Sequence, residues 1–156
     1  MTAVVLSRKL TIDLSTQFGA AAPYDFASEF QLWKNGGIGY GDTFGKNSLF
    51  ARPPELVRLG MEKVHLETQA DTARWNSMMD QGVTDPNAYT SNRVLVYSRL
   101  GDMQYQPFLL LQILDPGHAF MQDPSKVATL ALFHEMERAA FAKRVIGDNW
   151  VVAGMP

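Results

Sequence analysis

Residues 92–118, NRVLVYSRLGDMQYQPFLLLQILDPGH, decide the fold that we expect for this chain. Two apolar runs of strand-forming residues, 94–97 and 108–114, flank a turn that contains a Gly-Asp step. The second run has Gln112 as its one polar residue, so we expect it to be covered on both faces and to lie centrally in a sheet. The Asp-Pro-Gly sequence that follows ends this strand, because proline cannot donate a ladder hydrogen bond.

The composition is that of an ordinary globular domain. The chain has 156 residues, of which 46% are hydrophobic and 19% charged, enough for one domain with a core. Cysteine is absent, so neither a disulfide nor a thiolate metal site is expected. The apolar runs are too short for a signal peptide or a membrane span, and we expect a cytoplasmic protein with no membrane partner. The net charge of −2 argues against nucleic-acid binding by bulk charge, although a local basic patch is compatible with it.

The remaining segments complete a small α+β domain with a four-stranded, mostly antiparallel sheet, two N-terminal helices and one C-terminal helix. The predicted order is β-α-α-β-β-β-α, with elements over residues 4–14, 24–34, 55–60, 63–67, the two apolar runs above and 125–144. The first strand depends on the alternation of apolar and polar residues from Lys9 onward. Segments 15–23 and 38–52 are expected to be irregular. We expect a single domain over residues 1–156, with 68–91 as a loop insertion and 145–156 as a C-terminal tail.

Three histidines are candidates for proton transfer, because imidazole titrates near neutral pH. His118 directly follows the end of the central strand, a place where functional residues are common. His65 lies within the predicted strand 63–67, where a structural role is as good an interpretation. His134 fits the amphipathic pattern of the last helix, which favours a structural role.

Basic residues near these elements suggest a site for an anion. Lys46 lies within FGKNSLF (44–50), which also reads as a structural turn with two aromatic anchors. Arg93 and Arg99 flank the third strand, where they could instead form a solvated edge. If the sheet brings Lys46, Arg93 and Arg99 next to His118, the patch would stabilise a phosphodiester transition state by positioned charge. No spacing of residues indicates a metal site or a phosphate-binding glycine loop, so we expect no cofactor.

At FGKNSLF and at VLVYS…FLLLQILDPGH the chain resembles the YafO family of toxins from bacterial type II toxin–antitoxin pairs. The likeness runs from about residue 4 to 144 and includes the DFASEFQLWKNG helix and the His65-Leu66 strand. This family is related in element order to RelE-like toxins, which cut mRNA on the ribosome. The resemblance implies a metal-independent endoribonuclease that inhibits translation, with a cognate antitoxin, the ribosome and mRNA as partners. It implies no contact with DNA except through the antitoxin complex.

The resemblance also assigns roles to individual residues. RelE-like toxins commonly carry a basic residue directly before the LVY run, a position that Val94 occupies here, with Arg93 one residue earlier. A one-residue offset points a side chain to the opposite face, so Arg93 could serve only if the strand is bulged or begins at Val94. Some relatives use a histidine after the last sheet strand, which His118 matches. Some relatives carry an acidic or basic residue on the second strand, and Lys63, His65 or Glu67 could fill that place here.

In the mechanism that this resemblance implies, Lys46 and Arg99 or Arg93 hold the phosphate, and His118 is the general acid or base. The alternative is a non-catalytic toxin-like binding protein on the same scaffold, such as a gyrase inhibitor or a phage or plasmid regulatory factor. The slightly acidic net charge and the presence of Val94 before the LVY run favour this alternative. A third reading, a small-ligand domain, has no pocket signature in the sequence.

Overall fold

A mixed sheet forms the centre of the molecule. The computed structural model describes residues 3–100, 107–142 and 152–153. Five strands follow the order β2-β3-β4-β5-β1, and a two-residue strand, β6, pairs on the outer side of β1. The pair β1–β5 is parallel, and the other pairs in this sheet are antiparallel. The strands are β1 Val4–Leu6, β2 Phe44–Leu49, β3 Glu62–Leu66, β4 Val94–Arg99, β5 Phe108–Leu114 and β6 Val152–Ala153.

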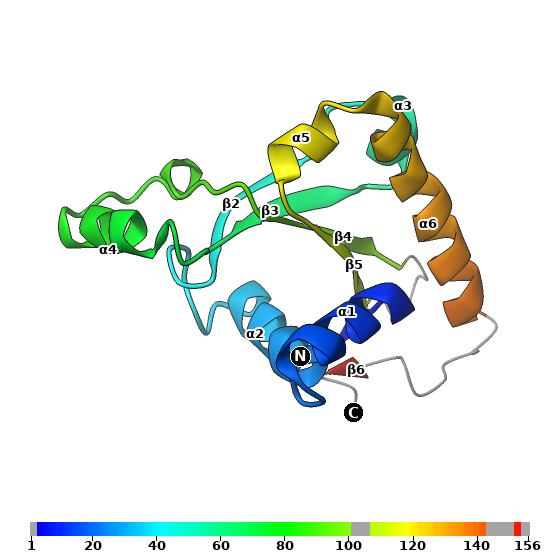
Figure 1. Ribbon diagram of the computed structural model, residues 1–156, viewed down its shortest axis with the longest axis horizontal. Helices are drawn as coiled ribbons and strands as arrows, with labels where there is room; N and C mark the ends of the chain where they lie inside the picture. Colours follow the sequence, from blue (N-terminus) through cyan, green and yellow to red (C-terminus); the bar gives the residue numbers. More distant parts are fainter. Residues whose placement is uncertain (1–2, 101–106, 143–151, 154–156) are drawn as a thin grey trace.

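Helices cover both faces of this sheet (Figure 1). The described helices are α1 Arg8–Phe18, α2 Ala22–Lys34, α3 Pro54–Arg58, α4 Thr72–Asp80, α5 Gly117–Met121 and α6 Pro124–Ala142, with a short 3-10 turn, η1, at Pro86–Ala88. Helices α1 and α2 lie on one side of the sheet, whereas α3, α5 and α6 lie on the other. Helix α4 projects at the left end of the view, beyond β2. None of the described helices is long and apolar enough to cross a membrane.

The central position predicted for β5 is confirmed. Leu110 packs in the apolar core on the α1 and α2 side, and its neighbours Leu109 and Leu111 pack in the core on the α3 and α6 side. All three leucines are fully buried. Burial of one such side chain contributes roughly 1.5–3 kcal/mol, so this strand ties the two layers together.

The prediction of a first strand over residues 4–14 is wrong beyond Leu6. The hydroxyl of Ser7 accepts a hydrogen bond from the backbone N–H of Leu10 at 3.1 Å and so caps the start of α1. Leu10 and Leu14, four residues apart, are buried on one side of α1, whereas Ile12 between them is 48% exposed. Helical spacing therefore decides which residues are buried, and the alternation in the sequence is incidental.

Other predicted elements agree with the structure in part. The helices at 24–34, 55–60 and 125–144 and the strands at 63–67, 94–97 and 108–114 are confirmed to within a few residues. The sheet has more strands than the predicted four, because β2 lies within the segment 38–52 that was expected to be irregular. Segment 68–91 contains α4 and η1, and α1 extends into the predicted loop at 15–23. Apart from β6, the tail at 145–156 lies outside the described residues.

Candidate functional site

Two histidines that lie far apart in the sequence meet on one face of the sheet. On β3, Val64 and Leu66 pack toward α1 and α2, so the alternation of side chains turns His65 to the opposite face. His118 lies in α5, shortly after β5 ends. The two ring centroids are 6.3 Å apart. The His65 residue is 8% exposed, whereas His118 is exposed, so a ligand would reach His118 first.

The dipeptide Ser91-Asn92, one residue before β4, holds both histidines in place. His65 Nδ1 lies 2.8 Å from the backbone nitrogen of Ser91 and 2.7 Å from its carbonyl oxygen. Burial lowers the pKa of His65, and the hydrogen bond with this backbone acts against that effect. Asn92 receives a hydrogen bond from the backbone N–H of Gly117 at 2.6 Å on its carbonyl oxygen. Its side-chain oxygen accepts a second one, from the backbone N–H of His118, at 2.9 Å. Sequence reasoning missed Ser91 and Asn92, since a Ser-Asn pair before a strand signals only a turn.

Two lysines surround the histidines with positive charge. Burial lowers the pKa of His65 below its ordinary value, and the charges of Lys46 and Lys63 lower it further. Burial, followed by the charge of Lys46, also lowers the pKa of Lys63, whose Nζ lies 5.0 Å from the ring centroid of Phe50. Within the described part of the chain, no carboxylate forms an ion pair with Lys46, Lys63 or His118. We call Lys46, Lys63, His65 and His118 the histidine cluster; its chemistry favours an anion.

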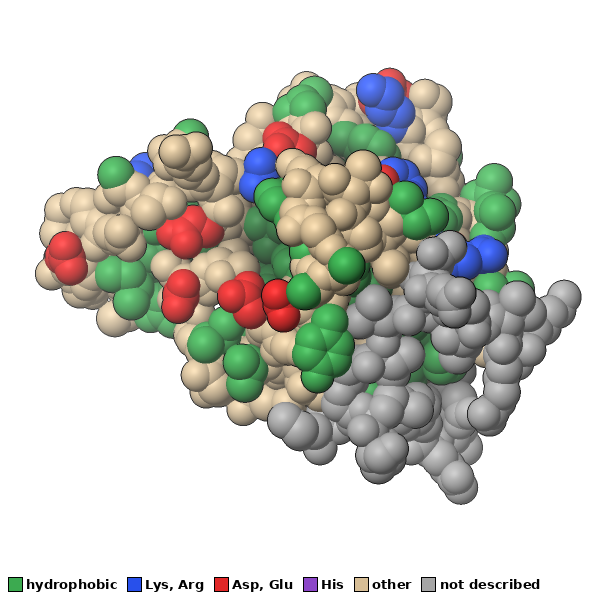
Figure 2. All heavy atoms as spheres, turned by 60° about the horizontal axis from the view of Figure 1, so that its bottom comes forward, with side chains coloured by type: hydrophobic (Ala, Val, Ile, Leu, Met, Phe, Trp, Pro, Cys, Tyr) green, Lys and Arg blue, Asp and Glu red, His purple; other side chains and the backbone are tan. Residues whose placement is uncertain are grey.

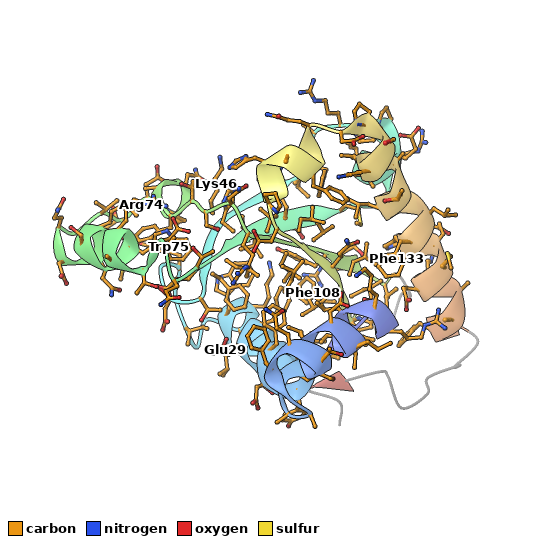
Figure 3. The ribbon with its side chains drawn as sticks, viewed as in Figure 1. Glu29, Lys46, Arg74, Trp75, Phe108 and Phe133 are labelled. Atoms are coloured by element: carbon orange, nitrogen blue, oxygen red, sulfur yellow. The ribbon has the colours of Figure 1, made fainter. Side chains whose placement is uncertain are left out.

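The insertion at 68–91 fixes the position of Lys46. A side-chain carbon on Gly45 would lie 2.2 Å from the carbonyl oxygen of Tyr89 and 2.7 Å from the Trp75 ring, so this approach requires glycine. The same Tyr89 carbonyl accepts a hydrogen bond from the backbone N–H of Lys46 at 2.8 Å. In Figure 3, Lys46 accordingly lies between α4 and α5. The insertion is therefore a structured support for the edge strand β2.

The two arginines expected at the site lie on the other face of the sheet. Arg93 forms an ion pair with Asp115 at 3.0 Å and lines hollows beside α1. The guanidinium carbon of Arg99 lies 4.2 Å from the ring centroid of Phe108, which belongs to the core under α1 and α2. Both arginines share the face of β4 that Tyr97 occupies, because residues two apart on a strand point the same way. The structure thus joins Lys46, His65 and His118, and it separates Arg93 and Arg99 from them.

A lysine and aromatic rings surround Arg99. Lys34 Nζ lies 4.4 Å from the Trp33 ring centroid and 4.8 Å from that of Tyr97. Burial lowers the pKa of Lys34; the charge of Glu62 acts against this effect and that of Arg99 adds to it. Contacts of this kind between cations and aromatic faces stabilise the fold, which accounts for Arg99 in structural terms.

The donor groups in the described residues do not converge in the manner of a metal site. No group of three or more His, Asp or Glu side chains lies close enough together in residues 3–100 and 107–142 to hold a metal ion. His134 of α6 is buried, and among the described residues neither of its ring nitrogens has a hydrogen-bond partner; a carboxylate oxygen of Glu135 lies 3.6 Å from Nδ1. Burial lowers the pKa of His134, which favours the neutral ring in the core.

The fold and this site define a class of protein: a small α+β domain that gathers two histidines and two lysines on one face of a mostly antiparallel sheet. The family model described as Toxin YafO, type II toxin-antitoxin system, matches residues 31–138, which is more than half of the chain. The chain therefore belongs to the YafO toxin family, and this membership implies a cognate antitoxin as its partner. The matched region begins within α2 and contains the whole histidine cluster. No curated protein and no solved structure matches the chain.

Proposed function

We propose that this toxin is an endoribonuclease that cleaves mRNA on the ribosome and so inhibits translation. The observation that carries the proposal is the pair of imidazole rings 6.3 Å apart, with Lys46 and Lys63 beside them. Cleavage of RNA by its own 2′-OH needs one base for the attacking oxygen and one acid for the leaving oxygen. Two histidines on one face of the sheet can supply both groups, and the lysines can supply charge for the phosphate.

His65 is the general base in this mechanism. Burial and the neighbouring cations lower its pKa, so the ring is neutral at pH 7. When Nδ1–H donates to the carbonyl oxygen of Ser91, the lone pair of Nε2 is free to accept a proton. Among the described residues, Nε2 forms no hydrogen bond with the protein and is not fully buried.

The bond changes follow from this assignment. His65 takes the proton of the 2′-OH, and the 2′-oxygen forms a bond to phosphorus. The bond between phosphorus and the 5′-oxygen breaks, and His118 gives its proton to that oxygen. The products are a 2′,3′-cyclic phosphate and a 5′-OH end. Lys46 and Lys63 stabilise the charge on the phosphate oxygens, a role that the sequence had suggested for Lys46 with Arg99 or Arg93.

Substitution of His118 tests the proposal. We expect His118→Ala to lower the rate of mRNA cleavage on translating ribosomes by roughly 10²- to 10⁴-fold, the usual contribution of a general acid. The protein should keep its thermal midpoint, because the His118 side chain is exposed on a short helix. An mRNA with a single 2′-deoxy nucleotide at the cleavage site is the control substrate, and it should remain uncut.

Two results would contradict the proposal. If His118→Ala cleaves mRNA at the wild-type rate, His118 has no part in the chemistry. If the toxin cuts the 2′-deoxy substrate as well as the RNA, the 2′-OH is not the nucleophile. Growth inhibition without any cut mRNA would instead support the non-catalytic alternative, in which the toxin acts by binding a protein target.

A further inference from the structure

A cleft opens directly beside the histidine cluster, between α3 on one side and α5 and α6 on the other. Its volume of about 810 Å³ exceeds the hollows of about 390, 400 and 450 Å³ elsewhere on the chain. This volume lies within the range that is typical of small-molecule sites. His118 and Lys63 line the cleft, so groups assigned to the phosphodiester also form part of its wall. A polymer held at that phosphate would therefore extend into the cleft.

The lining of the cleft suits a flat heterocycle. Phe50 and Val127 are 2% and 5% exposed and form an apolar floor. The polar side chains of Arg52, Glu55 and Gln122 lie at the exposed rim. A nucleobase combines apolar faces with donor and acceptor edges, and this arrangement of floor and rim matches both features.

The charges around the cleft favour a nucleotide over a neutral ligand. Lys63 and His118 lie at the end near the histidine cluster, and Arg52 lies at the rim. Arg52 has no carboxylate within ion-pair distance among residues 3–100 and 107–142. Cations at both places can contact successive phosphates of one RNA strand, with the base between them.

We infer that this cleft is the subsite for one of the two nucleotides that the scissile phosphate joins. The base lies against Phe50 and Val127, Gln122 and Glu55 contact its polar edge, and Arg52 holds the next phosphate along the strand. The inference rests on the proposed ribonuclease function and adds that the base in this cleft sets the sequence preference of cleavage.

A substitution that fills the cleft tests the inference. Ala128 is exposed on α6 and lines the cleft, so Ala128→Trp should occupy the space without disturbing the core or the histidine cluster. The probes are inorganic phosphate and the 3′- and 5′-monophosphates of the four ribonucleosides, titrated by calorimetry into the full chain. The wild type should bind at least one nucleotide more tightly than phosphate. Ala128→Trp should weaken that binding roughly 10- to 100-fold, because the indole takes the space of the base, and leave phosphate binding unchanged.

Ala139→Trp is the matched control, because Ala139 is an exposed alanine of the same helix outside the cleft. It should bind nucleotides as the wild type does. The inference is overturned if no nucleotide binds more tightly than phosphate, or if Ala128→Trp binds nucleotides as tightly as Ala139→Trp does.

Experiments can disprove the subsite and the ribonuclease role independently of each other. If His118→Ala retains full cleavage but Ala128→Trp still weakens nucleotide binding, the subsite stands and the catalytic proposal is lost. If the wild type cleaves mRNA and Ala128→Trp cuts the same sites at the same rate, the catalytic proposal stands and the subsite is lost.

Discussion

His65 sits where the backbone of one residue, Ser91, can serve two states of its ring. A protonated Nδ1 donates to the Ser91 carbonyl oxygen at 2.7 Å, whereas an unprotonated Nδ1 accepts from the Ser91 N–H at 2.8 Å. Both contacts cannot form in one protonation state of that nitrogen. The Ser91 backbone therefore satisfies Nδ1 whether or not that nitrogen carries a proton.

The pH dependence of cleavage should report the environment of His65. Burial and nearby cations lower the pKa of His65 below its ordinary value of about 6.5, so the base is active at pH 7 and is lost by protonation below that value. The acidic limb of a pH–rate profile should therefore lie below about pH 6.5. Lys46→Gln should move this limb to higher pH, because it removes a positive charge that disfavours the protonated ring.

Lys9→Gln is the control for this experiment. Lys9 is exposed on α1 and pairs with Asp13 at 2.7 Å, on the other side of the sheet from His65. It should leave the acidic limb in place. An acidic limb above pH 6.5 in the wild type, or a limb that Lys46→Gln does not move, would contradict the role of His65 as a base in a cationic site.

The sequence predicts part of this site residue by residue. His118 could be found from its place after a strand-ending Asp-Pro-Gly, and Lys46 from its place in FGKNSLF. The assignment of Arg93 and Arg99 depended on which face of β4 they occupy, and a run of apolar residues buried on both faces does not reveal this. Lys63 was one of three choices on its strand, and it shares the face of His65 because the two residues are two apart on β3.

At the scale of the elements, β2 depends on contacts that are remote in the sequence. Its sequence, FGKNSL, contains glycine and polar residues that favour turns, which is why a strand was not predicted there. Pairing with β3 on one side and contact with Tyr89 and Trp75 on the other hold it extended. Trp75 itself is fully buried, and its indole N–H donates to the carbonyl oxygen of Thr90 at 3.0 Å. The insertion thus replaces the missing neighbour of an edge strand.

Gly45→Ala should uncouple this insertion from β2. The added methyl group would overlap the Tyr89 carbonyl and the Trp75 ring, so we expect a loss of about 1–3 kcal/mol in the free energy of unfolding. Cleavage should fall as well, because the backbone N–H of Lys46 donates a hydrogen bond to the same Tyr89 carbonyl group. The measurement is urea unfolding of both proteins, together with the rate of mRNA cleavage.

Gly39→Ala is the matched control, because no atom lies within 4 Å of the side chain it would add and Gly39 is not in the left-handed region. It should change the free energy of unfolding by no more than about 1 kcal/mol, and any change should be a stabilisation. If Gly45→Ala is as stable as Gly39→Ala, the close approach of the insertion to β2 is not a constraint on the fold.

At the scale of the whole molecule, the net charge hides local groups of like charge. Figure 2 turns the α1 and α2 side toward the reader, and carboxylate side chains gather there. Burial raises the pKa of Glu29 on this side, and the charges of Asp42 and Asp25 raise it further, which shows that these carboxylates repel one another. The lysines of the histidine cluster lie on the opposite side of the sheet. The net charge of −2 sums over both sides, so it did not reveal the local cationic site in the sequence.

The local group of cations makes a prediction about RNA binding. Each phosphate contact with single-stranded RNA contributes about −0.7 to the slope of log K against log salt concentration. Contacts from Lys46, Lys63 and Arg52 should give a slope of about −2 for a 2′-O-methyl oligonucleotide, which cannot be cut. Lys46→Ala should reduce the magnitude of this slope by about 0.7, whereas Lys9→Ala on α1 should leave it unchanged.

Fluorescence titration at several salt concentrations provides the slope. A value near zero would mean that the lysines do not contact phosphate, and a slope steeper than about −4 would place the RNA on a broader basic surface than the histidine cluster offers.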